Sequence, residues 1–82
     1  MVIFKVFVDP ENIDAVEKSL RAITAGDFKD LKREAIGFGI EVIRVGYVIP
    51  DKVDGAMTNL EAAVKAVPLI NEAEVEMATL IS

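Results

Sequence analysis

The sequence predicts an α+β domain in which four strands and two helices follow one another in the order βαββαβ. Segments with the alternating, β-branched pattern of strands surround two segments whose apolar residues recur at the spacing of amphipathic helices. Prolines and glycines stand between these segments, where the chain must turn. The chain has 82 residues, of which 52% are hydrophobic, and this size suits a single domain, residues 1–82, with one core.

The first predicted strand is residues 2–8, which are rich in Val, Ile and Phe and end at Asp9-Pro10. Side chains alternate between the two faces of a strand, so one face of this segment is wholly apolar and should point to the core. That face comprises Val2, Phe4, Val6 and Val8.

The first helix should follow, over about three turns, and end at Ala25-Gly26-Asp27. Its apolar face is formed by Ile13, Val16, Leu20 and Ile23. We expect the side chain of Asn12 to cap its N-terminus. Glu17, Lys18 and Arg21 lie away from the apolar face.

Two strands and a tight loop come next. Residues 28–34 are charged and suit an edge strand, whereas residues 40–49 are apolar on both faces and suit a central one. Between them, Gly37 and Gly39 bracket Phe38. Glycine relaxes the backbone sterics on each side of the ring, so the chain can turn sharply there and form a hairpin.

The second helix and the last strand complete the pattern. After a linker at residues 52–55, an apolar helical face precedes Pro68, which ends the helix; the face comprises Met57, Leu60, Val64 and Val67. Residues 73–81 then read as a strand in which acidic positions alternate with apolar ones. The acidic positions are Glu72, Glu74 and Glu76.

Together these elements predict a ferredoxin-like βαββαβ sandwich, a four-stranded antiparallel sheet with two helices on one face. Right-handed crossovers are expected to place the first and third strands side by side and parallel in the centre, with the others as antiparallel edges. The face without helices should carry opposite charges that pair across strands, among a few apolar side chains. Its residues are Ile3, Lys5, Phe7, Arg44, Glu74 and Glu76.

Composition excludes several classes of function. The chain has no histidine and no cysteine, so the usual zinc, copper and thiolate sites are absent and we expect no cofactor. The net charge of −5 argues against nucleic acid as a partner, since such binding depends on Lys and Arg. No apolar run is long enough to span a bilayer and the start is not a signal peptide, so we expect a soluble, cytoplasmic protein.

Three stretches are candidate sites. Phe38 is either packed back onto the core or exposed as an anchor that enters a partner's pocket. The carboxylates Glu72, Glu74 and Glu76 are favoured as a solvated, partly ion-paired face over a cation site. Residues 49–52 either end a strand or form a charged loop that docks on a partner.

The Phe38 loop carries a more specific resemblance. The run from Arg33 to Val45, with Gly37-Phe38-Gly39 at its centre, resembles the guanine-nucleotide-exchange domain of elongation factor 1-beta. Ala35 stands where that family often has proline, and Pro50-Asp51 stands where it often has a pair of acids. The likeness extends over essentially the whole chain, and the length matches the stand-alone archaeal form.

The resemblance implies a translation elongation factor that is not an enzyme: it promotes exchange of GDP for GTP on elongation factor 1-alpha by non-covalent contact. It further implies that Phe38 inserts into the partner, with Gly37, Gly39, Asp51 and Lys52 as further partner-binding residues. The lysine that eukaryotic relatives carry near the C-terminus is missing, since this chain ends Thr79-Leu80-Ile81-Ser82. That route to displacing the partner's magnesium is therefore not carried over.

Other classes of function fit the same fold. A ligand-binding or oligomerising regulatory domain would use the semi-apolar open face of the sheet. An RNA-binding module would need exposed aromatic residues in basic surroundings, for which Phe7 alone is poor support. An enzyme based on carboxylates lacks a convergent set of residues.

Overall fold

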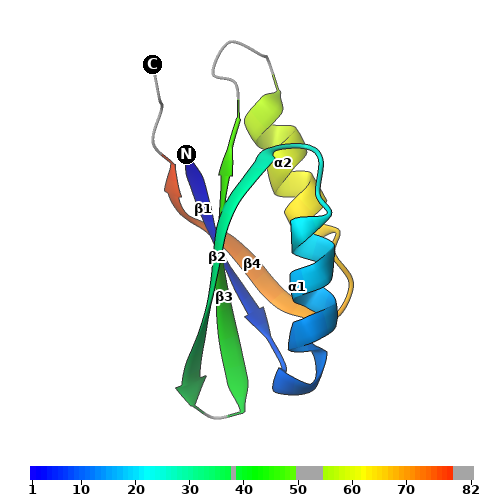
Figure 1. Cartoon of the computed structure of the whole chain (residues 1–82), viewed down its shortest axis with the longest axis vertical. Helices are drawn as coiled ribbons and strands as arrows, with labels where there is room; N and C mark the ends of the chain where they lie inside the picture. The colour runs from blue at the N-terminus through cyan, green and yellow to red at the C-terminus, as the bar shows by residue number, and fades with distance from the viewer. Residues whose placement is uncertain (38, 50–54, 79–82) are drawn as a thin grey trace.

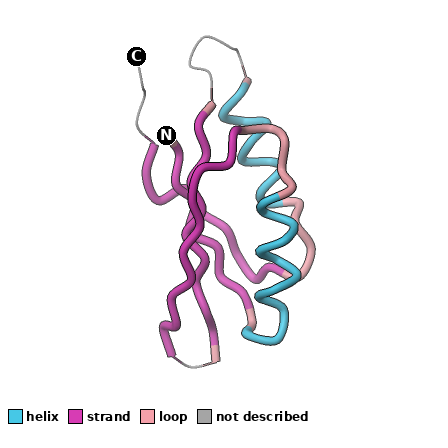
Figure 2. Tube along the Cα trace, viewed as in Figure 1, coloured by secondary structure: helices cyan, strands magenta, loops and turns pink. Residues whose placement is uncertain are grey.

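The computed structural model describes residues 1–37, 39–49 and 55–78. Its elements are β1 (Val2–Val8), a 3₁₀ turn η1 (Pro10–Asn12), α1 (Ile13–Arg21), β2 (Asp27–Gly37), β3 (Ile40–Val48), α2 (Ala56–Lys65) and β4 (Ile70–Ala78). The strands form one sheet in the order β2-β3-β1-β4, and every neighbouring pair is antiparallel. Both helices lie on one face of this sheet (Figures 1 and 2). The predicted ferredoxin-like sandwich is confirmed.

The direction of the central strand pair corrects the sequence prediction. β1 and β3 are neighbours, as expected, but they run antiparallel, with Val2 opposite Tyr47 and Val8 opposite Glu41. The physical reason lies in the connections. The crossover through α1 makes β2 parallel to β1 but leaves room for a strand between them, and β3 enters that space by turning back from β2. A hairpin reverses direction, so β3 must oppose β1.

The core lies between the sheet and the helices. The apolar face of β1 is buried as predicted, and the helix-facing side of β3 joins it. Tyr47 is the largest buried side chain; its ring meets Phe4 and Phe28 edge-on, with ring centroids 6.2 Å and 6.1 Å apart. Its hydroxyl donates a 2.6 Å hydrogen bond to the Leu20 carbonyl. The helices bury Ile13, Val16, Leu20, Ala56, Leu60 and Val64.

The start of α1 differs from the prediction. Asn12 makes no side-chain capping bond, and its backbone is near-helical, with φ −104° and ψ −2°. An N-cap residue needs an extended backbone to aim its side chain at the first free N–H groups. The turn η1 denies it that geometry, because the Asn12 N–H already bonds to the Asp9 carbonyl at 2.9 Å.

The ends of the elements show two smaller differences. α1 ends at Arg21, several residues before the predicted stop, although Ile23 still packs against the core. β4 begins at Ile70 instead of Ala73, because Ile70 pairs with Val8 at the end of β1. A register shift between Phe7 and Val8 accompanies this pairing.

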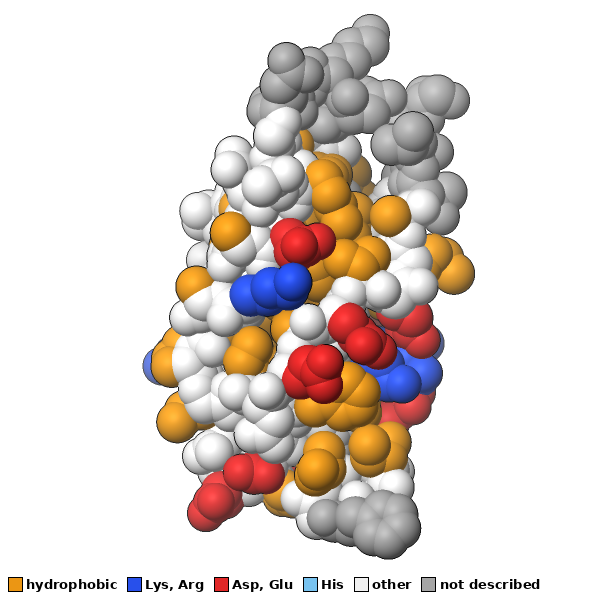
Figure 3. Space-filling model, turned by 180° about the vertical axis from the view of Figure 1, so that it is seen from behind, with side chains coloured by type: hydrophobic (Ala, Val, Ile, Leu, Met, Phe, Trp, Pro, Cys, Tyr) orange, Lys and Arg blue, Asp and Glu red, His pale blue; other side chains and the backbone are white. Residues whose placement is uncertain are grey.

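The β4 side of the sandwich is only partly covered. β2 lies nearest the viewer in Figure 1, so the reverse view in Figure 3 shows the β4 side, where hydrophobic side chains form a band along the long axis, crossed by acidic ones. Leu69 and Met77 are more than half exposed. No helix among the described residues is long and apolar enough to cross a membrane.

Candidate partner-binding site

The loop between β2 and β3 requires its glycines for their backbone conformation. Gly37 and Gly39 have φ values of 88° and 72°, in the left-handed region that other residues rarely adopt. A Cβ built on either would meet nothing within 4 Å. The strands on both sides pair with each other, Ala35 opposite Glu41 and Gly37 opposite Ile40, and the register shifts between these two pairs. The hairpin predicted from the Gly-Phe-Gly pattern is confirmed.

The hairpin extends beyond the third strand of the sheet. β1 ends at Val8, which lies opposite Glu41, so past this point β2 and β3 pair only with each other. We call this two-stranded end the hairpin arm and define it as residues 36–37 and 39–40. Ile36 is 47% exposed on it. The arm forms one end of the molecule, which measures 40 × 19 × 17 Å (Figure 1).

The predicted partner-binding residues belong to two segments of the chain. Phe38, Asp51 and Lys52 lie outside the described residues. Their described neighbours are Gly37 and Gly39 at one end of β3, and Ile49 at the other. A strand rises about 3.3 Å per residue, so Gly39 and Ile49, on either side of β3, lie about 30 Å apart.

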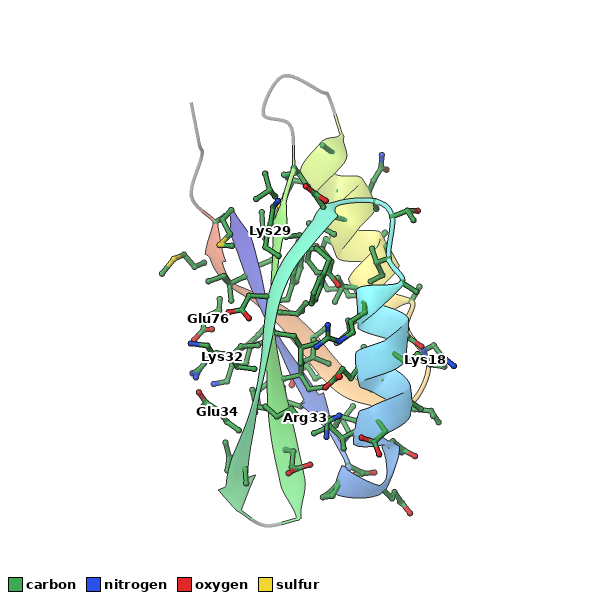
Figure 4. The ribbon with its side chains drawn as sticks, in the orientation of Figure 1. Lys18, Lys29, Lys32, Arg33, Glu34 and Glu76 are labelled. Carbon is green, nitrogen blue, oxygen red and sulfur yellow. The ribbon has the colours of Figure 1, made fainter. Side chains whose placement is uncertain are left out.

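A salt-bridge network connects β2 to α1 just before the arm. Arg33 donates from Nε to Glu17 Oε1 at 2.7 Å and from a terminal nitrogen to Asp14 Oδ1 at 2.8 Å. Glu17 also accepts a 3.2 Å bond from Arg21 Nε, and the Arg21 guanidinium lies 5.0 Å from the centre of the Phe28 ring. We call Asp14, Glu17 and Arg33 the arm bridge. In Figure 4, Arg33 lies between β2 and α1.

The arm bridge changes the acidity of its members. The hydrogen bond from Arg33 lowers the pKa of Glu17 below its ordinary value, and Arg21 adds to this effect. The hydrogen bonds to Asp14 and Glu17 raise the pKa of Arg33. Both shifts favour the charged forms of Glu17 and Arg33.

The open face of the sheet carries a second ionic network. Arg44, in the centre, binds Glu34 of β2 and donates from Nε to Glu76 of β4 at 3.0 Å. The bond to Glu76 is the largest cause of a raised pKa at Arg44, followed by the charge of Glu34. Lys5 lies 5.4 Å from the centre of the Phe7 ring. The ion pairs of Arg44 with Glu34 and Glu76 confirm the expected pairing of opposite charges across strands. Figure 4 shows Glu34 and Glu76 on the side of the sheet away from the helices.

A shallow hollow on this face has a volume of about 170 Å³. Its lining comprises Met1, Ile3, Asp30, Lys32, Arg44, Gly46 and Glu76. Ligand pockets are commonly about 300–1,000 Å³, and the guanidinium in this hollow already has two carboxylate partners. Among the described residues, no three acidic side chains come close enough to hold a metal ion.

Sequence reasoning missed the arm bridge. It placed Glu17 and Arg21 on the outer side of α1 and assigned no partner to Arg33. One signal was available: Arg33 alternates with Lys32 and Glu34, and therefore shares the helix-facing side of β2 with Leu31. An arginine on the inner face of an edge strand needs acidic partners, and the adjacent helix supplies them.

Comparison with known proteins agrees with this geometry. The profile of a family described as the EF-1 guanine nucleotide exchange domain matches residues 1–81. The chain belongs to this family. The match includes β1 to β4 and both helices, and therefore also the hairpin arm.

Three archaeal proteins named elongation factor 1-beta are similar along nearly their whole length. The protein of Methanoculleus marisnigri is 32% identical over 82 residues, which cover 98% of this chain and 94% of that protein. The protein of Methanospirillum hungatei is 31% identical over 77 residues, covering 90% and 89% of the two chains. That of Methanocorpusculum labreanum is 30% identical over 78 residues, covering 93% and 88%. The predicted membership of the elongation factor 1-beta family, in its archaeal form, is confirmed.

Proposed function

We propose that this chain promotes the exchange of GDP for GTP on elongation factor 1-alpha through protein–protein contact. The observation that carries the proposal is the match of the exchange-domain family to residues 1–81. The hairpin arm supports it, because both glycines beside Phe38 adopt the left-handed conformation that a narrow, projecting loop needs. Exchange would take place in the cytoplasm, where this partner delivers aminoacyl-tRNA to the ribosome.

The proposed mechanism is a shift of populations and involves no covalent step. A factor that binds the nucleotide-free conformation of its partner more tightly than the GDP-bound one lowers the barrier to GDP loss. Phe38, with Gly37 and Gly39 as its flanks, would provide the main contact, and Asp51 and Lys52 a second one. GDP and GTP would be bound by the partner and not by this chain.

The test is GDP release from the cognate elongation factor 1-alpha loaded with a fluorescent analogue of GDP. The wild-type chain should accelerate release in proportion to its concentration until the partner is saturated. If the nucleotide leaves no faster at any concentration of the chain, the proposed function is wrong.

Phe38→Ala should lower this stimulation about 30-fold, the loss expected when a hot-spot residue worth about 2 kcal/mol is truncated. The matched control is Met77→Ala, which truncates an exposed apolar side chain on β4 and should leave the rate unchanged. Urea denaturation separates contact from folding. A buried Phe38 would make its alanine variant about 3–5 kcal/mol less stable, and that outcome would contradict the anchor role.

A further inference from the structure

The hairpin arm has little support from the core. All β2 residues from Lys32 to Gly37 are exposed, and the last β2 side chain that packs against the core is Leu31. β2 is an edge strand, so its outer side has no neighbour in the sheet. Beyond Val8, β3 no longer pairs with β1 either. At the arm, β2 is therefore held by its pairing with β3 and by the polar contacts at the base of the arm.

The polar contacts at the base of the arm hold two successive β2 residues, one on each face of the sheet. Arg33 reaches Asp14 and Glu17 on the helix side, while Glu34 binds Arg44 on the open side. In Figure 4, Glu34 points away from the helices, together with Glu76 and Lys32, whereas Arg33 lies toward α1. The strand is thus fixed on both sides at the base of the arm, three and four residues before Gly37.

Of the two contacts, only the arm bridge connects the arm to the helical layer. Its carboxylates come from the first two turns of α1, and Glu17 is further held by Arg21. Arg33 hydrogen-bonds to both carboxylates at 2.7–2.8 Å, distances typical of charge-assisted bonds. A guanidinium bonded to two fixed carboxylates restricts the direction of the arm more than a single ion pair would.

We infer that Arg33 is a positioning residue for the proposed exchange: by bridging Asp14 and Glu17, it fixes the direction of the arm that ends in Gly37-Phe38-Gly39. The inference rests on the proposed function, because the direction of the arm matters to a partner only if its tip makes the contact. An arm that is already ordered loses less conformational entropy on binding. Since exposed ion pairs contribute little to global stability, the bridge should affect the arm more than the fold.

The test compares Arg33→Gln with Lys29→Gln. Lys29 also belongs to β2 and forms an exposed ion pair, 3.2 Å from Asp27, but it lies toward the opposite end of the strand. Both variants remove one positive charge, so long-range attraction to a charged partner changes equally. Arg33→Lys is the conservative variant, which keeps the charge but lacks the planar fork that reaches two carboxylates at once.

The first measurement uses the free chain. Backbone ¹⁵N relaxation should show lower order parameters at Ile36, Gly37 and Gly39 in Arg33→Gln than in wild type or Lys29→Gln, with an intermediate loss in Arg33→Lys. Unchanged order parameters would overturn the inference, whether or not the chain promotes GDP release. This measurement therefore distinguishes failure of the inference from failure of the proposed function.

The second measurement is GDP release from elongation factor 1-alpha. Arg33→Gln should reduce the stimulation about threefold or more relative to Lys29→Gln, the scale of an exposed ionic contact. In a Phe38→Ala background the same change should have no further effect, since Arg33 acts through the loop. Equal rates for the two glutamine variants, or a full additional loss in the Phe38→Ala background, would overturn the positioning role.

Discussion

The Tyr47 side chain joins the sheet to the first helix, because its ring is buried beside Phe4 and Phe28 while its hydroxyl donates to the Leu20 carbonyl. Burial raises the pKa of Tyr47 to about 12. A tyrosine in an unfolded chain ionises near pH 10. Folding therefore favours the neutral phenol, and this contribution is fully present below about pH 10 and is lost as the pH rises through about 12.

Tyr47→Phe should lower the free energy of unfolding at pH 7 by about 1 kcal/mol, because a buried hydrogen bond is lost. The variant should also lose less stability than wild type between pH 10 and pH 11. Urea denaturation at pH 7, 10 and 11 measures both effects, and Tyr47 is the single tyrosine of the chain. If both proteins lost the same amount of stability between pH 10 and pH 11, burial of Tyr47 would not explain the alkaline loss.

The structural roles of some single residues can be predicted from the sequence, whereas those of others cannot. Gly37 and Gly39 could be predicted, because a pair of glycines around an aromatic residue points to a local backbone requirement. The roles of Arg33 and Tyr47 could not, because they depend on which side chains α1 brings near β2 and β3. Those contacts join residues 16 to 27 positions apart, and no local pattern encodes them.

Among the elements, the connection between α1 and β2 packs closely against its neighbours at Gly26. A Cβ on Gly26 would lie 3.1 Å from Leu60 Cδ1 and 3.2 Å from both Ile49 Cγ2 and Tyr47 Cβ. α2, β3 and the segment after β3 therefore all approach this connection. Glycine is needed here for space, whereas at Gly37 it is needed for its φ value.

Gly26→Ala should destabilise the fold by about 1–3 kcal/mol, the usual cost of overpacking a core. Gly46→Ala is the matched control, because a Cβ there would meet the end of the flexible Met1 side chain, at 3.3 Å from Cε. Gly46→Ala should lose clearly less stability than Gly26→Ala. Thermal denaturation of the two variants measures the difference, and a larger loss for Gly46→Ala would contradict the packing argument.

The order and type of the elements could be predicted from periodicity, whereas their relative directions and some ends could not. Alternating apolar residues identified β1, and helical spacing identified both helices. The antiparallel β1–β3 pair was missed because strand direction follows from the whole path of the connections. The predicted side-chain cap at Asn12 is wrong because η1 determines the backbone conformation of that residue.

For the whole molecule, the main result is that the two predicted contact segments border opposite ends of β3. If both touch one partner, that partner must extend along the length of the sheet or contact the chain at two separated places. Effects of changes at sites more than about 10 Å apart, with no shared neighbours, usually add to within about 0.5 kcal/mol.

Phe38→Ala and Lys52→Ala should therefore have additive effects on the logarithm of the GDP release rate. The measurement is a double-mutant cycle with the wild type, both single variants and the double variant. Additive losses are expected if each segment makes its own contact. A double variant no worse than Phe38→Ala would show that the segments act as one unit, contrary to this prediction.

The pairing of Val2 with Ala78 has a practical consequence for assays. Both residues lie at the end of the sheet opposite the hairpin arm, since Val2 faces Tyr47 whereas the arm begins beyond Glu41. A chain immobilised on a sensor surface through a linker attached beside either residue would display its glycine hairpin outward, toward dissolved partner. The attachment chemistry would then leave the hairpin arm unobstructed, and the Arg33 and Lys29 variants could be compared in the same orientation.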